Sequence, residues 1–176
     1  MAREFFEVSI KDVIVETPDA RSLVLDLPPV LRDRFRYEAG QFLTVEIPWD
    51  GFSIWRCYSL SSAPEIDPDP KVTVKRVADG RMSNWIHDHL QAGDTIRVSP
   101  PEGRFLLNRD AGDAALTLCA AGSGITPVIS LAKVALASTA RSVRLVYANR
   151  DAGSIIFKRE LDELSQRYPE RLEVRH

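Results

Sequence analysis

The stretch Ala121-Gly122-Ser123-Gly124-Ile125-Thr126-Pro127 sets the architecture expected for the second half of this chain. It follows an apolar run at residues 114–121 that is typical of a buried strand in a parallel sheet. Thr126 is the predicted N-cap of the next helix, and Pro127 is its predicted first residue. The two glycines keep side chains out of the turn, where main-chain N–H groups can bind a pyrophosphate. Because the third glycine of the common dinucleotide fingerprint is missing, an ordinary helix start is the alternative interpretation.

Strands and helices alternate after this turn. Residues 127–138 carry apolar side chains at helical spacing, residues 143–148 form a second candidate strand, residues 154–168 form a second helix, and residues 172–174 begin a third strand. This βαβαβ order predicts a partial doubly wound nucleotide-binding domain over residues 114–176, with right-handed crossovers. The last strand would leave an unpaired edge, so we expect the sequence to be part of a longer protein.

Residues 1–107 show a different pattern, in which short alternating runs are separated by Pro, Gly and Asp. Alternation with period two predicts antiparallel strands in a small barrel or sandwich. One short helix over residues 84–90 interrupts the strands, with Ser83 as its N-cap and Gly93 as its stop signal. A polar linker at residues 108–113 separates the two domains. The six candidate strands are residues 6–10, 22–27, 42–47, 54–60, 72–77 and 95–98.

The stretch Arg56-Cys57-Tyr58-Ser59 lies in the fourth of these strands and offers a cation, an aromatic face and a hydroxyl. On an extended strand the side chains of Arg56 and Tyr58 point to the same side. A flavin dinucleotide needs a cation for its pyrophosphate, an aromatic plane against its ring, and a hydroxyl near its hydride-accepting atoms. Arg56, Tyr58 and Ser59 match these three needs. An ordinary strand with an exposed Arg and a half-buried Tyr is the alternative, which so short a match favours when taken alone.

A second group of candidates follows one strand later. Lys75-Arg76-Val77 precedes Gly80-Arg81-Met82-Ser83, which runs into the short helix. Gly80 permits close backbone approach, while Ser83 and the first helical N–H groups form a candidate anion site. The alternative is that Ser83 only caps its helix and Gly80 only makes a turn, although a cap hydroxyl can also meet a phosphate. Two anion sites would suit the two ends of one pyrophosphate.

The second strand of the nucleotide domain ends at Asn149, Arg150 and Asp151, with Ser154 close behind. In a doubly wound domain this position contacts the adenosine ribose. An acidic residue there favours NAD, whereas an Arg can accept the extra phosphate of NADP. Because both residue types are present, the pattern favours NADPH and leaves dual use open.

Composition excludes several classes of protein. The chain has 176 residues and a formal net charge of −2, so no basic field for nucleic acid is present. No apolar run reaches membrane-spanning length, and the first residues do not form a signal peptide. Cys57 and Cys119 are too few for an iron–sulfur cluster or a disulfide framework, which favours the cytoplasm. His87 and His89 fall on different helix faces and are interpreted as surface residues, so no metal site is predicted.

Taken together, the three stretches around residues 56–59, 80–83 and 122–127 resemble the marker motifs of the ferredoxin–NADP reductase superfamily, in its order and spacing. Tyr147-Ala148-Asn149-Arg150 and Ser154-Ile155-Ile156-Phe157 are similar to reductase components of bacterial multicomponent oxygenases, of the phenylacetyl-CoA and ketosteroid hydroxylase type. The resemblance implies a six-stranded antiparallel Greek-key FAD-binding barrel followed by a partial NAD(P)-binding domain. It also implies a ferredoxin-type iron–sulfur protein or domain and an oxygenase component as partners.

The resemblance also implies a role for each motif residue. Arg56 would hold the FAD pyrophosphate, Tyr58 would stack on the isoalloxazine, and Ser59 would hydrogen-bond near its N5. Thr126 would lie between flavin and nicotinamide, which makes Ser59 and Thr126 the candidate catalytic residues. The other cofactor-binding candidates are Cys57, Val74, Lys75, Arg76, Gly80, Arg81, Met82 and Ser83 for FAD, and Gly122, Ser123, Gly124, Ile125, Pro127, Asn149, Arg150 and Ser154 for NADPH or NADH.

The sequence therefore predicts an FAD-dependent oxidoreductase that moves electrons from NAD(P)H through flavin to an iron–sulfur acceptor, in the service of an oxygenase. A non-catalytic FAD-binding subunit that transfers electrons only within a complex is the alternative, and an interaction module without cofactor is a third hypothesis. Members of the superfamily continue to a Cys-Gly-containing strand, and the oxygenase reductases often add a plant-type 2Fe-2S domain. Residues 1–176 contain neither. Flavin binding is thus predicted for this chain, and turnover by it is left open.

Overall fold

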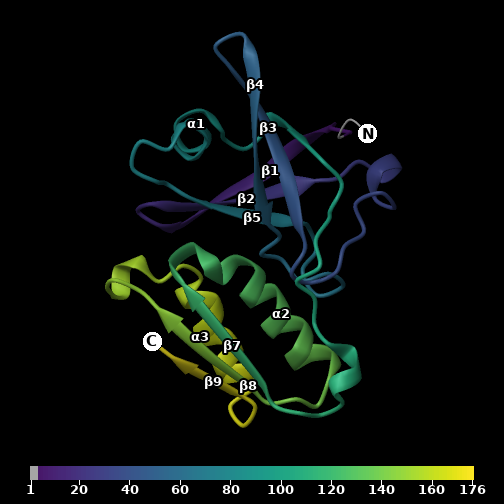
Figure 1. The fold of residues 1–176 in the computed structure, drawn as a ribbon, viewed down its shortest axis with the longest axis vertical. Helices are drawn as coiled ribbons and strands as arrows, with labels where there is room; N and C mark the ends of the chain where they lie inside the picture. The colour runs from purple at the N-terminus through teal and green to yellow at the C-terminus, as the bar shows by residue number, and fades with distance from the viewer. Residues whose placement is uncertain (1–3) are drawn as a thin grey trace.

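Two sheets form the frame of the molecule, one antiparallel and one parallel (Figure 1). The computed structural model describes residues 4–176. The antiparallel sheet has six strands in the order β4-β3-β6-β1-β2-β5, so that hairpin neighbours alternate with longer connections. This order confirms the predicted Greek-key arrangement. The strands are β1 (Phe6–Thr17), β2 (Ala20–Asp26), β3 (Phe42–Trp49), β4 (Phe52–Ser59), β5 (Lys71–Lys75) and β6 (Thr95–Val98).

The antiparallel sheet closes into a barrel because its two end strands meet. Leu60 pairs with Val72, and the N–H of Ser61 donates to the carbonyl of Lys71 at 2.7 Å. Closure pairs backbone groups that would otherwise form a free edge. The inward-facing side chains of the alternating strands then fill a single apolar core, which includes Val8, Ile10, Leu23, Leu25, Leu43, Val45, Ile47, Val72, Val74, Ile96 and Val98.

The short helix α1 (Arg81–His89) differs from its prediction at both ends. Its N-cap is Gly80, not Ser83. The Ser83 hydroxyl accepts a hydrogen bond from the N–H of Val77 at 3.1 Å, so it closes the turn before the helix instead of capping the helix. At the other end the helix stops at His89, four residues before Gly93, whose φ of +95° turns the chain into β6.

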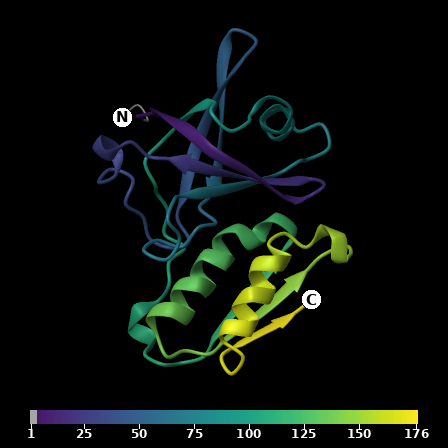
Figure 2. The ribbon, with the colours of Figure 1, turned by 180° about the vertical axis from the view of Figure 1, so that it is seen from behind.

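The second half of the chain forms a three-stranded parallel sheet in the order β7-β8-β9. Both of its helices lie on the same face of the sheet, as Figures 1 and 2 show from opposite sides. Side chains on that face are buried, whereas Thr117, Cys119 and Val146 point to the other face and are exposed. The apolar run at residues 114–121 therefore does contribute a strand of a parallel sheet, but this strand is buried on one face only. The elements are β7 (Leu116–Ala121), α2 (Ile125–Ser138), β8 (Val143–Ala148), α3 (Lys158–Arg167) and β9 (Leu172–Arg175).

Both helices of this half begin at other residues than expected. A 3-10 turn, η3 (Gly122–Gly124), leads directly into α2, so Gly124 is the N-cap and Ile125 the first residue. Thr126 is not the N-cap, because its hydroxyl donates backwards to the Ser123 carbonyl at 3.1 Å. Pro127 is consequently the third residue of α2, where its missing N–H costs no intrahelical bond. Helix α3 starts only at Lys158, after a second 3-10 turn, η4 (Ala152–Ser154), and a Phe157 with a φ of +63°.

A buried network of ion pairs joins the helices to the barrel. The ammonium of Lys133 on α2 lies 2.7 Å from a carboxylate oxygen of Asp67 in the barrel, and it also pairs with Glu160 on α3. The side chain of Lys133 is only 6% exposed, while Lys71 of β5 approaches Glu160 at 3.4 Å. Two cations and two carboxylates thus neutralise one another where the two halves meet.

Lys133→Met should lower the free energy of unfolding by about 3 kcal/mol, because two partly buried carboxylates lose their shared cation. Chemical denaturation of the purified chain measures this loss. Lys158→Met is the matched control, since Lys158 pairs with Asp162 on the exposed surface of α3, and it should cost less than about 1 kcal/mol. Equal losses in the two variants would show that the network does not stabilise the junction.

Candidate functional site

The three predicted motifs come together around β5. Strands β4 and β5 and helix α1 contact one another, and β5 also contacts the η3 turn. The motif in β4, the N-terminus of α1 and the glycine turn before α2 therefore surround one strand, although they are far apart in the sequence. This grouping results from barrel closure and from the packing of the two halves.

Strand β4 places Arg56 and Tyr58 on one side and Cys57 on the other. Burial raises the pKa of Tyr58 to about 12, against the opposing effect of the Arg56 charge, so the phenol stays neutral at physiological pH. Arg56 is exposed, and Ser59 is half-buried at the end of the strand. The thiol of Cys57 lies 3.6 Å from the Thr44 hydroxyl. A neutral, half-buried aromatic ring beside an exposed guanidinium suits a flat ligand that carries phosphate.

The N-terminus of α1 offers free main-chain donors. Gly80 provides no side-chain cap, and the first N–H groups of a helix have no intrahelical acceptor. A Cβ at Gly80 would lie 2.5 Å from the Ser83 oxygen, so a side chain here would displace the hydroxyl that accepts from the N–H of Val77. Arg81 is exposed, whereas the side chain of Met82 is buried in the barrel core. Backbone donors beside an exposed Arg fit a phosphate group.

Strand β5 contributes fewer free side chains than the sequence indicated. Val74 is fully buried, and its carbonyl accepts a hydrogen bond from Nε2 of His87 at 2.9 Å. His87 was interpreted as a surface residue, but it packs between α1 and β5 and is buried. Arg76 pairs with Asp88 at 2.7 Å and with Asn84 at 3.2 Å, both on α1. These contacts fix the helix against the strand.

The glycine turn is open on its outer side. Gly122 has a φ of +50°, and a Cβ there would meet Nζ of Lys75 at 4.0 Å. A Cβ at Gly124 would meet nothing within 4 Å. The Tyr147 hydroxyl on β8 donates to the Gly122 carbonyl at 2.9 Å and so ties the turn to the parallel sheet. A turn free of side chains next to a lysine fits a nucleotide phosphate.

The remaining residues of this stretch belong to the start of α2. Ile125 is buried in the core, Thr126 is almost fully buried, and Pro127 is partly buried. Ser123 is exposed at the turn. Of the two candidate catalytic residues, Thr126 therefore uses its hydroxyl as a donor within its own turn.

At the end of β8 only part of the predicted group is available to a ligand. Asp151 and Ser154 form a capping box, in which the Asp151 carboxylate accepts from the N–H of Ser154 at 2.9 Å. Within residues 4–176, the buried side-chain oxygen of Asn149 has no hydrogen-bond partner, so it is available to accept a hydrogen bond from a ligand. Arg150 is mostly exposed, and its Nη2 lies 3.4 Å from a carboxylate oxygen of Asp19.

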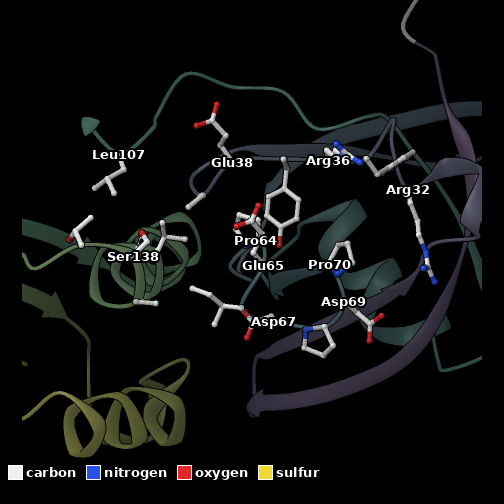
Figure 3. A pocket seen from close by; sticks show the side chains of 18 of the residues that line it. Arg32, Arg36, Glu38, Pro64, Glu65, Asp67, Asp69, Pro70, Leu107 and Ser138 are labelled. Atoms are coloured by element: carbon white, nitrogen blue, oxygen red, sulfur yellow. Dashed lines mark hydrogen bonds between the residues drawn. The ribbon is translucent and has the colours of Figure 1, made fainter. Parts of the chain in front are cut away.

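A hollow of about 500 Å³ lies beside Arg150. Its lining includes Asp19, Lys75, Arg76 and Arg150. It lies between β5, α1 and the end of β8. A larger hollow of about 1140 Å³ opens elsewhere, where barrel loops face the C-terminal end of α2 (Figure 3). The larger hollow contains none of the predicted cofactor residues. Asp19 was not predicted, because a turn between two strands carries no motif that indicates a ligand.

Comparison with known families agrees with this geometry. Residues 7–106 match the oxidoreductase FAD-binding domain, and residues 118–176 match the oxidoreductase NAD-binding domain. The chain belongs to the ferredoxin–NADP reductase family. The open glycine turn and the α1 N-terminus of this reductase-family chain fit the phosphate-bearing cofactors of these domains.

Curated relatives and a solved structure extend the comparison. The chain is 50% identical over 170 residues to the ferredoxin reductase component of 3-ketosteroid-9-alpha-monooxygenase from Rhodococcus rhodochrous, covering 96% of this chain and 48% of the relative. It is 33% identical to one component of the 1,2-phenylacetyl-CoA epoxidase of Escherichia coli, with 97% and 48% covered. It also superposes with a TM-score of 0.80 on a Neisseria gonorrhoeae ferredoxin NADP+ reductase with bound FAD and NADP, at 27% identity, covering 99% of this chain and 68% of that one. The chain spans about half the length of the curated relatives it matches.

Membrane-spanning helices and metal-binding clusters are both absent from the described part of the chain. No helix within residues 4–176 is both long and apolar enough to cross a bilayer. Over the same residues, no group of three or more His, Cys, Asp or Glu side chains is placed to hold a metal ion.

His87→Gln should reduce the loss of stability on acidification. Burial lowers the pKa of His87 below its ordinary value, against the opposing effect of the hydrogen bond to Val74. The unfolded chain therefore takes up a proton near pH 6.5 that the folded chain still excludes. The contribution of the neutral His87 to the free energy of unfolding is thus present above about pH 6.5 and is lost as pH falls. Urea midpoints at about pH 7.5 and pH 5.5 measure the effect.

The matched control for this prediction is His89→Gln. His89 is exposed and stacks on Trp85 at a centroid distance of 5.1 Å. This control should keep the wild-type pH dependence. If His87→Gln and wild type lose the same stability over this interval, the buried imidazole does not set the pH dependence.

Proposed function

We propose that this chain is the core of an NAD(P)H-dependent flavoprotein reductase, which passes electrons from the nicotinamide through FAD to a ferredoxin-type iron–sulfur acceptor that serves an oxygenase. The observation that carries the proposal is the meeting of three motifs around β5: the strand that carries Arg56 and Tyr58, the N-terminus of α1 and the glycine turn all contact this strand or its neighbour. The 50% sequence identity to the ferredoxin reductase component of a monooxygenase supports a ferredoxin-type protein as the electron acceptor.

Bound FAD would supply the chemistry, since a flavin accepts a hydride and releases electrons singly. The chain supplies positions and charge. Arg56 would bind the pyrophosphate together with the α1 N–H groups and Arg81, while Tyr58 would pack against the flavin ring. Ser59 would donate a hydrogen bond to the reacting edge of the ring.

The nicotinamide nucleotide would bind over the glycine turn. Gly122 and Gly124 leave room for its phosphates, and Lys75 supplies the nearest cation. Thr126 would then lie beside the nicotinamide and would exclude water from it. Asn149 would accept a hydrogen bond with its unpaired oxygen, and Arg150 would contact the adenosine ribose.

We further propose that residues 1–107 and 114–176 act as flavin and nucleotide domains, connected by residues 108–113. The two separate apolar cores support this division. The cytoplasm is the proposed compartment, supported by Cys57 and Cys119, which are free and exposed thiols suited to reducing conditions.

The proposal is tested by purifying the chain, adding excess FAD and FMN, removing free flavin and recording the visible spectrum. Retention of FAD alone, followed by anaerobic bleaching with NADH or NADPH, is the expected result. Retention of FAD without bleaching would instead favour a flavin-binding subunit that works only within a complex. A colourless protein would remove the flavin assignment.

Arg56→Ala should weaken FAD binding by at least about tenfold, because charge-assisted hydrogen bonds to a pyrophosphate are lost. Fluorescence titration with FAD measures the change. Arg34→Ala is the control, since Arg34 is also exposed but pairs with Glu4 and lies over the Phe6 ring. If both variants bind FAD with the same affinity, Arg56 is not part of the site.

A further inference from the structure

The turn between β1 and β2 brings a carboxylate of the barrel into the nucleotide half. Asp19 lies in this turn, which approaches the segment around residue 150 in both views (Figures 1 and 2). One carboxylate oxygen of Asp19 lies 3.5 Å from Nζ of Lys75 and 3.4 Å from Nη2 of Arg150. The two cations come from different halves of the chain, and both line the same hollow as Asp19.

Asp19 is held more firmly than the arginine that it contacts. Its second carboxylate oxygen accepts from the Thr17 hydroxyl at 2.8 Å, and its carbonyl accepts from the N–H of Arg76 at 2.6 Å. The Asp19 side chain is 30% exposed, against 77% for Arg150. Burial acts to raise the pKa of Asp19, but the Thr17 hydroxyl and the two cations lower it overall, so the carboxylate is charged at neutral pH.

A fixed negative charge at this place discriminates between the two nicotinamide nucleotides. NADPH differs from NADH by a 2′-phosphate dianion, for which Arg150 is the proposed partner. Asp19 neutralises this arginine and repels a dianion that approaches it. A ribose 2′-hydroxyl, in contrast, can donate to a carboxylate. The acidic residue at the end of β8, Asp151, uses one carboxylate oxygen to cap its own turn, whereas Asp19 forms the ion pair with Arg150.

We propose that Asp19 is a specificity-determining residue that disfavours a 2′-phosphate next to Arg150 and so favours NADH over NADPH. The inference rests on the proposed nucleotide site and adds to it a residue from the flavin-binding half. It also reverses the preference for NADPH that Arg150 alone indicated.

The test is a titration of the FAD-supplemented chain with 2′,5′-ADP and with 5′-AMP, followed by NMR chemical shifts. Asp19→Asn keeps an acceptor for the Thr17 hydroxyl but removes the charge. It should tighten the binding of 2′,5′-ADP by about fivefold relative to 5′-AMP, the scale expected for one partly exposed ion pair. Asp162→Asn, which removes the same charge from the exposed surface of α3, should change neither affinity.

Arg150→Ala provides the second arm. As a single substitution it should weaken the binding of 2′,5′-ADP by less than about threefold, because Asp19 already neutralises the arginine. Combined with Asp19→Asn, it should abolish the tighter binding of 2′,5′-ADP that Asp19→Asn causes by itself. Asp19→Glu should retain the wild-type preference. Because Arg150→Ala changes only an exposed side chain, this arm remains informative if Asp19→Asn does not fold.

The outcomes separate the two levels of the proposal. If both nucleotides bind and Asp19→Asn leaves their ratio unchanged, Asp19 does not determine specificity, while the nucleotide site stands. A large loss of 2′,5′-ADP binding in Arg150→Ala alone would likewise overturn the role of Asp19. If neither nucleotide binds to wild type, the proposed nucleotide site fails, and the inference about Asp19 fails with it.

Discussion

The buried ion pairs of Lys133 are the interaction on which the arrangement of the two halves depends. A lysine ammonium that is almost excluded from water needs anionic partners, and Asp67 of the barrel and Glu160 of α3 supply them. The Ser130 hydroxyl adds a hydrogen bond of 2.6 Å to a barrel carbonyl one turn earlier on α2. These directional contacts set how α2 lies on the barrel. Because the glycine turn opens the same helix, they also set where that turn meets β5.

Strand β5 consequently serves two purposes. Its central residues, such as Val72 and Val74, complete the barrel core and are fully buried. Its last residue, Lys75, lies between the Asp19 carboxylate and the glycine turn, at the boundary between the two halves. The same strand is tied to α1 by the imidazole of His87. A change in the packing of β5 would therefore alter both the barrel half of the chain and the position of Lys75 beside the glycine turn.

Many features of the fold could be predicted from local patterns. Short apolar runs between turn residues located the six strands, although burial alternates only in part of them: β6 alternates exposed and buried residues, whereas Leu43, Thr44 and Val45 are buried in succession on β3. Helix starts were less predictable. Ser83 and Thr126 are good N-cap residues in isolation, but each hydroxyl found a nearer backbone partner in the turn before its helix. The burial of His87 was missed because nothing next to it in the sequence shows that β5 lies across it.

Residue identity and spacing alone pointed to the family and its two kinds of domain, which the comparisons confirm, and to three candidate phosphate-binding motifs, because each motif is a continuous segment whose chemistry is local. Which motif side chains are free to meet a ligand depended on tertiary contacts. Val74, Met82 and Ser154 are turned inward or used within turns, whereas Arg56 and the glycine turn stay open. Asp19 came to lie beside Arg150 only through folding, since the hairpin turn that carries it lies more than a hundred residues from Arg150 in the sequence. Long-range pairing of charges is a property of the packed chain, and no local pattern encodes it.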